Sequence, residues 1–290
     1  MAPNPNRHIP GDRVNLGTAE PRMSTPQVTV STLAAQKARA EPIACLTCYD
    51  ASFARLLEDA GVEVLLVGDS LGMVLQGQQT TVPVTLDQMV YHCACVARRR
   101  ERSLLIGDLP FLTYATPRQA LSTAGRLMQE GGAQMVKLEG GAAMLDTVAA
   151  LTAQGVPVCG HLGLLPQSIH KLGGYRFQGR DQASAQAIRD DAQALQAAGA
   201  GLLVLECVPA TLATDIARSL SIPVIGIGAG AGCDGQVLVL HDMLGLNPDR
   251  PPSFSKDFLQ GRDDGVPGAL VAYVQAVKTR TFPGPGQTTA

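Results

Sequence analysis

Charged and polar side chains stand at the ends of several short apolar runs of this chain. The clearest examples are Asp69 in VEVLLVGDS, Asp108 in LLIGDLPF, Lys137 and Glu139 in AQMVKLEGG, His161 in VPVCGHLGL and Glu206 in GLLVLECVP. Residues that directly follow apolar segments are partly removed from water, and carboxylates gathered there without a cation are costly. If these side chains meet in space, something positive must neutralise them.

A divalent cation with a preference for oxygen suits the acidic residues of this set. Asp69, Asp108 and Glu139 offer only carboxylate oxygens, and no Cys or His pair accompanies them, so the donors favour Mg²⁺ over zinc. Because Mg²⁺ takes few protein ligands, positions stay open for water or substrate. An oxo acid would chelate the ion through its keto and carboxylate oxygens, with Lys137 against the substrate carboxylate. The ion would then stabilise an enolate as a Lewis acid.

Enolate chemistry also requires a base, and Glu206 is the candidate because it lies in the apolar run LLVLECVP. The alternative is a structural glutamate paired with a buried cation such as Lys137. His161 in CGHLGL is placed to donate a hydrogen bond to the enolate or carboxylate oxygen. A buried histidine that only orients its neighbours remains an open alternative.

Strand-like and helix-like segments alternate along the chain. The apolar runs are 43–48, 62–70, 104–111, 133–141, 156–164, 201–209, 222–230 and 236–242. Amphipathic segments lie between them, at 52–60, 85–100, 117–130, 142–154, 182–198 and 211–220, and several end at a glycine before the next run. Near-continuous apolar strands are typical of parallel sheets, which are buried on both faces.

This alternation predicts an α/β fold, a single (β/α)8 TIM barrel, in which all strands point the same end toward one mouth. A doubly wound open sheet is the alternative. It is less favoured because no G-x-G-x-x-G follows the first strand and the polar residues are spread over many strand ends.

The two ends of the chain have a different composition from the barrel. Residues 1–27, rich in Pro, Asn and Arg, predict a disordered N-terminal extension, in which Met23 is a candidate start, and residues 281–290 a disordered tail. The barrel domain is assigned to residues 28–280, with an N-terminal capping helix at 30–38 and a final helix at 265–279. The long segment 164–180 predicts a lid over the mouth or a plain surface excursion.

Composition excludes several classes of protein. The 290 residues are 46% hydrophobic and 17% charged, with a net charge of −2, which argues against a nucleic-acid partner. No apolar run approaches the ~20 residues of a membrane span, and no secretory signal is present. Seven cysteines without such a signal indicate the cytoplasm. Cys45 and Cys48 form a C-x-x-C, a redox pair or metal clip in principle, but on a strand their thiols point to opposite faces.

The chain resembles the ketopantoate hydroxymethyltransferase family of the phosphoenolpyruvate/pyruvate superfamily from about residue 28 to about residue 260. The matching stretches occur in the family's order: TCYDASFARL, LLVGDSLGMVLQG, GDLPFLTYAT, MVKLEGG, VCGHLGLLPQSI, GGYRFQGR, LLVLECVP, IPVIGIGAG and DGQVLVLHDMLG. TCYD replaces the more common TAYD and LLPQS replaces LTPQS, and neither change touches a proposed ligand or the base.

The resemblance implies a cytoplasmic homodecamer that binds Mg²⁺ through Asp69, Asp108 and Glu139. It implies that Asp69, Ser70, Asp108 and Lys137 contact the oxo acid, that His161 lines the site and that Glu206 accepts the proton. The substrates would be 3-methyl-2-oxobutanoate and 5,10-methylenetetrahydrofolate, and the product 2-dehydropantoate. A folate-independent lyase of the same superfamily and a catalytically silent assembly subunit are the alternatives.

Overall fold

Eight parallel strands close into a barrel in chain order, each bonded to its sequence neighbours, and β8 returns to β1. The computed structural model describes residues 26–247 and 251–288. The predicted TIM barrel is therefore confirmed, and the open sheet was the wrong alternative. The strands are β1 (Ile43–Thr47), β2 (Val64–Val67), β3 (Leu104–Asp108), β4 (Met135–Glu139), β5 (Val158–Gly163), β6 (Leu202–Glu206), β7 (Val224–Ile227) and β8 (Gly235–Leu238).

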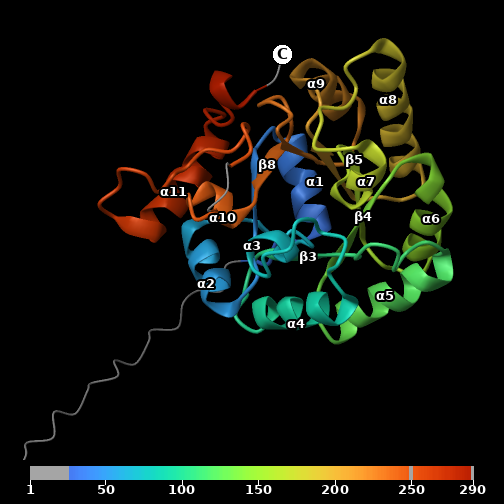
Figure 1. The fold of residues 1–290 in the computed structure, drawn as a ribbon, viewed down its shortest axis with the longest axis horizontal. Helices are drawn as coiled ribbons and strands as arrows, with labels where there is room; N and C mark the ends of the chain where they lie inside the picture. The colour runs from blue at the N-terminus through green and yellow to red at the C-terminus, as the bar shows by residue number, and fades with distance from the viewer. Residues whose placement is uncertain (1–25, 248–250, 289–290) are drawn as a thin grey trace, which may run out of the picture.

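The longer helices surround the strands in the connections, as Figure 1 shows. They are α2 (Ala51–Ala60), α4 (Leu86–Ala97), α5 (Pro117–Gln129), α6 (Leu145–Ala153), α8 (Gln182–Ala197), α9 (Ala210–Ser219) and α11 (Gly265–Lys278). Short helices are α3 (Leu71–Val74), α7 (Ile169–Leu172) and α10 (Leu240–Met243), with 3-10 turns η1 (Ala142–Met144), η2 (Pro166–Ser168) and η3 (Pro285–Gln287). Each predicted helical segment matches a helix to within one turn.

Local chemistry explains where these helices begin and end. The Asp50 carboxylate accepts hydrogen bonds from the backbone N–H groups of Ser52 and Phe53, which caps the start of α2. Gly61 ends the same helix with a φ of 95°, a left-handed conformation that glycine adopts without strain. The glycine at the end of this helix therefore acts as predicted, and the Asp50 cap is added by the structure.

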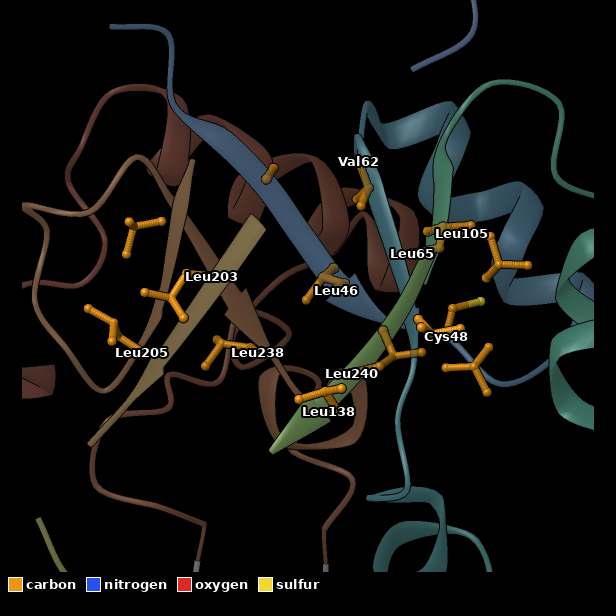
Figure 2. Packing of buried hydrophobic residues seen from close by; sticks show 14 of the residues in the cluster. Leu46, Cys48, Val62, Leu65, Leu105, Leu138, Leu203, Leu205, Leu238 and Leu240 are labelled. Carbon is orange, nitrogen blue, oxygen red and sulfur yellow. The ribbon is translucent and has the colours of Figure 1, made fainter. Parts of the chain in front are cut away.

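Two apolar layers follow from the alternation of side chains along each strand. Leu46, Leu65 and Leu105 face outward and pack with helix residues in one buried cluster. Figure 2 shows these three side chains on neighbouring strands. Cys45 belongs to the second cluster, which fills the barrel interior, whereas Cys48 belongs to the outer one. The C-x-x-C thiols thus lie on opposite sides of the barrel wall, as predicted.

Helix α1 (Val30–Ala38) closes the amino-terminal end of the barrel. Its Leu33 is buried in the interior cluster together with residues at which strands begin, such as Ile43 and Leu104. In Figure 1, α1 crosses the middle of the barrel. With this end covered, the carboxyl ends of the strands are the open side. The predicted capping helix is present with the predicted bounds.

The C-terminal prediction needs a correction, because order extends beyond residue 280. Phe282 is buried, and its ring packs at 5.5 Å from the Phe258 ring and 5.9 Å from the Tyr273 ring, measured between centroids. Tyr273 in turn donates to the carbonyl of Cys45 on β1. The composition of FPGPGQTTA obscured this anchor, because a single aromatic residue gives no periodic signal. Residues 289–290 lie outside the described residues.

Replacing Phe282 with alanine should destabilise the protein by about 3–5 kcal/mol, since it removes a buried ring that packs against Phe258 and Tyr273. Chemical denaturation followed by circular dichroism measures this change. Phe111→Ala, which truncates an exposed ring of the same type, is the control and should cost about 0.5 kcal/mol or less. Equal effects of the two substitutions would contradict an anchoring role for Phe282.

Some predictions concern residues that the structure does not describe. The N-terminal extension, up to residue 25 and including Met23, lies outside the described residues. Within the described ranges, none of the helices has both the length and the apolar character required to span a bilayer.

Candidate active site

The alternation that fills the barrel interior also selects the polar residues that point into it. On β4, Met135 belongs to the interior cluster, so Lys137 and Glu139 continue the same inward row toward the carboxyl end. Asp108 follows Ile106 on β3 in the same way. The apolar layers therefore end in a layer of charged groups.

The register of the strands places these charged groups side by side on adjacent strands. Asp108 lies beside Lys137 on the neighbouring strand, and Glu139 lies beside His161. His161 follows Cys159 of the interior cluster on β5, and Glu206 follows Val204 on β6. Residues far apart in the chain thus meet because their strands are neighbours.

Lys137 is paired with Asp108 inside the barrel. The Lys137 Nζ atom lies 3.0 Å from Asp108 Oδ1, and both side chains are buried. The backbone N–H of Asp69, which follows β2, donates to Asp108 Oδ2 at 3.2 Å. Lys137 therefore pairs with Asp108, and the alternative in which Lys137 holds Glu206 as a structural partner is not what the structure shows.

His161 lies between two carboxylates. Its Nδ1 atom is 3.5 Å from Glu139 Oε1, and its Nε2 atom is 3.2 Å from Glu206 Oε2. Burial and the positive charge of Lys137 both oppose protonation, but hydrogen bonding to Glu139 and Glu206 outweighs them and raises the pKa of His161 to about 9. The imidazole therefore lies within 3.5 Å of both carboxylates.

Burial dominates the electrostatics of the acidic group. It raises the pKa of Asp69 to about 8, and the charges of Asp108 and Glu139 add to this effect against the attraction of Lys137. The pKa of Asp108 is also raised by burial, with Lys137 opposing the shift. The pKa of Lys137 is raised, because the three carboxylates overcome the effect of its own burial.

A cavity of about 640 Å³ opens above this charged layer, at the carboxyl ends of the strands. Its walls contain every predicted site residue: Asp69, Ser70, Asp108, Lys137, Glu139, His161 and Glu206. Tyr175, Arg176 and Phe177 from the long segment after β5 also line it, so this segment borders the mouth. A volume of this size is in the range of small-molecule sites.

The donor set fits a magnesium ion held by two carboxylates. Four carboxyl groups, those of Asp69, Asp108, Glu139 and Glu206, face two basic side chains, Lys137 and His161, so acidic groups outnumber basic ones at the site. In the described part of the chain, no three His, Cys, Asp or Glu side chains come close enough together to hold a metal ion directly. Mg²⁺ commonly uses one or two carboxylates and completes its shell with water and substrate. Asp69 and Asp108 meet that requirement, and direct ligation by Glu139 stays a prediction.

Sequence reasoning missed three polar residues of this site. Gln167 donates to Asp69 Oδ2 at 2.8 Å, Tyr114 donates to Gln167 Oε1 at 2.5 Å, and Tyr49 and Ser70 share a hydrogen bond of 2.9 Å. All three lie just past strands rather than at their ends. Their stretches, LLPQSI, GDLPFLTYAT and TCYDASFARL, carried the resemblance, but no spacing rule placed them near the carboxylates.

Solved structures with the same fold include enzymes that act on small oxo acids. Phosphonopyruvate hydrolase matches with a TM-score of 0.59 at 12% identity, over 76% of this chain and 84% of that one. Oxaloacetate acetylhydrolase in complex with oxalate matches with a TM-score of 0.54 at 16% identity, over 73% of this chain and 81% of that one. The fold and the charged layer together define a (β/α)8-barrel enzyme with its site at the carboxyl ends of the strands.

The family is given by the sequence comparisons. Residues 27–285 match the family model described as ketopantoate hydroxymethyltransferase. The 3-methyl-2-oxobutanoate hydroxymethyltransferases of Methylococcus capsulatus and Nitrosococcus oceani are 60% and 59% identical, covering 90% and 89% of this chain and 96% and 97% of those proteins. The chain belongs to the ketopantoate hydroxymethyltransferase family, and it is a hydroxymethyltransferase.

Proposed function

We propose that the chain, as a 3-methyl-2-oxobutanoate hydroxymethyltransferase of pantothenate and coenzyme A biosynthesis, uses Glu206 as its base and Asp69 and Asp108 to hold Mg²⁺. The substrates are 3-methyl-2-oxobutanoate and 5,10-methylenetetrahydrofolate, and the product is 2-dehydropantoate. The observation that carries this proposal is one cavity that is lined both by a buried cluster of acidic side chains and by the separate carboxyl group of Glu206.

The acidic half of the cavity suits the oxo acid. Lys137, which pairs with Asp108, lines the cavity and would provide a positive charge for the substrate carboxylate, and Ser70 borders the same space. A bound Mg²⁺ supplies Lewis-acid stabilisation of the charge that develops on the keto oxygen. Asp69 and Asp108 would hold the ion, and Glu139 is predicted to complete the acidic group beside them.

Glu206 would remove the proton from C3 of the oxo acid. His161 Nε2 lies 3.2 Å from Glu206 Oε2, and it would orient the carboxylate if it donates a hydrogen bond to it when the substrate is bound. Because the side chain of Glu206 is 14% exposed, whereas those of Asp108 and Lys137 are 4% and 6% exposed, Glu206 has more access to the cavity than the buried pair has. The carbanion then forms a C–C bond to the methylene carbon of the folate. Over the whole reaction this carbon loses its two bonds to folate nitrogens and gains the oxygen of one water molecule, so that tetrahydrofolate leaves as the second product.

The folate must therefore enter the same cavity. The part of the wall formed by β8 and the segments after it contributes apolar surface and three polar side chains, those of Asp242, Asn247 and Ser253. Phe254 on that wall adds an aromatic face. We place the pterin ring in this part of the cavity, beside the oxo acid.

Product formation should require both the metal and the folate. With 3-methyl-2-oxobutanoate, 5,10-methylenetetrahydrofolate and Mg²⁺, the purified protein should form 2-dehydropantoate, and a chelator should lower the rate by about 100-fold or more. Added Mg²⁺ should restore the rate, and mass spectrometry of the product gives the measurement. Cleavage of an oxo acid without folate would instead indicate a folate-independent lyase. The absence of any turnover would indicate a catalytically silent assembly subunit.

The location and assembly of the enzyme are part of the same proposal. A reducing cytoplasm is supported by the free state of all seven cysteines, of which only Cys95 is not fully buried. A homodecamer is supported by the family resemblance and by exposed apolar side chains such as Tyr91 and Leu112. Light scattering on the eluted protein measures the number of subunits.

A further inference from the structure

A glutamine from the loop after β5 lies inside the acidic group, at 5% exposure. We infer that Gln167 is a positioning residue that sets the orientation of the Asp69 and Glu139 carboxylates, and that Tyr114 holds Gln167 in place for this task. The inference rests on the proposed function, because those carboxylates are assigned there to the metal and the oxo acid.

The side chain of Gln167 connects the ends of two strands. Its Nε2 atom donates to Asp69 Oδ2 at 2.8 Å, just past β2, and to the carbonyl of Leu109 at 2.9 Å, just past β3. Both partners are acceptors, so the amide can only present its NH₂ group to them. A buried carboxylate that accepts a hydrogen bond from a fixed amide has one of its oxygens, and therefore its plane, held in place.

The main chain of Gln167 reaches a third strand end. Its backbone N–H donates to Glu139 Oε2 at 3.0 Å. Pro166 precedes it in the turn η2, where the fixed φ of proline restricts the backbone that carries this N–H. A single residue therefore contacts both Asp69 and Glu139, two of the three predicted acidic ligands, although they come from different strands.

Tyr114 fixes the other end of the amide. Its hydroxyl donates to Gln167 Oε1 at 2.5 Å and accepts from the backbone N–H of Glu139 at 3.4 Å. Both side chains are buried, so an unmade hydrogen bond would leave a polar atom without water. Tyr114, Gln167, Asp69 and Glu139 form one connected network in which each member restricts the next.

Replacement of Gln167 with methionine tests the side-chain role. Methionine keeps the length of the side chain but removes both N–H donors, while the backbone bond to Glu139 remains. Groups that orient metal ligands typically account for 10–100-fold in metal affinity, so Mg²⁺ alone should bind about 10–100-fold more weakly by calorimetry. The rate should fall through kcat at limiting Mg²⁺, with the KM for the folate unchanged.

A matched control removes the same kind of bond at the surface. Gln186 on α8 donates to Asp190 Oδ1 at 2.8 Å and is exposed. Gln186→Met should leave the Mg²⁺ affinity within twofold of the unmodified protein. Circular dichroism and thermal melting of both variants separate a lost fold from a lost site. A folded Gln167→Met protein with unchanged Mg²⁺ affinity would overturn the inference.

Tyr114→Phe provides a milder variant that is informative even if Gln167→Met does not fold. It removes only the hydroxyl, and it should weaken Mg²⁺ binding by about threefold to tenfold. Because Tyr114 is inferred to act through Gln167, the double variant should bind Mg²⁺ no more than about twofold more weakly than Gln167→Met alone. Additive effects, or full affinity in Tyr114→Phe, would contradict the inference.

These outcomes are distinct from failure of the proposed function. If the unmodified protein forms 2-dehydropantoate and binds Mg²⁺, the function stands whatever the Gln167 and Tyr114 variants do. If the unmodified protein forms no product but Gln167→Met still lowers Mg²⁺ affinity, the positioning role stands while the proposed reaction fails.

Discussion

Glu206→Gln should lower the formation of 2-dehydropantoate by about 10²–10⁴-fold, the usual contribution of a positioned general base. Glutamine is nearly isosteric and can still contact His161 Nε2, which lies 3.2 Å from the native Oε2 atom. It cannot accept a proton at neutral pH. Since Asp69, Asp108 and Lys137 are untouched, the variant should still bind Mg²⁺ and the oxo acid.

The partial reaction separates proton removal from folate chemistry. In heavy water, the unmodified protein should exchange the C3 proton of 3-methyl-2-oxobutanoate for deuterium, and Glu206→Gln should slow this exchange as strongly as it slows turnover. NMR of the substrate follows the exchange. Glu130→Gln, which changes an exposed glutamate on the outside of the barrel, is the control. Exchange at the native rate in Glu206→Gln would remove Glu206 as the base.

Asp108→Ala should weaken Mg²⁺ binding by about 100-fold or more, because a directly ligating carboxylate contributes at least as much as a group that only orients one. The substitution also removes the partner of Lys137, which lies 3.0 Å away and is buried. Lys137 keeps Asp69 and Glu139 as neighbouring negative charges. We therefore expect a folded variant with some loss of stability, whose weaker Mg²⁺ binding is measured separately from that loss.

Titration calorimetry with Mg²⁺ alone measures this effect, and thermal melting measures the change in stability. Asp87→Ala is the matched control, since it breaks an ion pair of 2.8 Å with Arg126 at the surface. Exposed pairs of this kind contribute little, so neither measurement should change appreciably. Unchanged Mg²⁺ affinity in Asp108→Ala would count against the proposed ligand pair.

The buried pair between Lys137 and Asp108 changes how Glu206 is interpreted. A glutamate in an ion pair with a buried lysine would have a structural role, because its charge would be needed to neutralise the lysine. Here the lysine is committed to Asp108, and Glu206 contacts His161 and borders the cavity. The proposed role of Glu206 as the base is therefore assigned to a carboxyl group that is not paired with the lysine.

Much of the fold could be predicted from local patterns in the chain. Apolar runs predicted all eight strands, and glycines such as Gly61 predicted where several of the helices between them end. Polar residues at strand ends predicted which side chains would line the mouth. These predictions succeed because alternation, capping and strand-end position each depend on a few neighbouring residues.

Pairings between distant residues required the tertiary structure. Strand register decides that Lys137 pairs with Asp108 and that His161 lies between Glu139 and Glu206. The path of a loop brings Gln167 to Asp69, and the packing of α11 buries Phe282. No local pattern encodes such contacts, because each depends on where a closed barrel places two segments that are far apart in the chain.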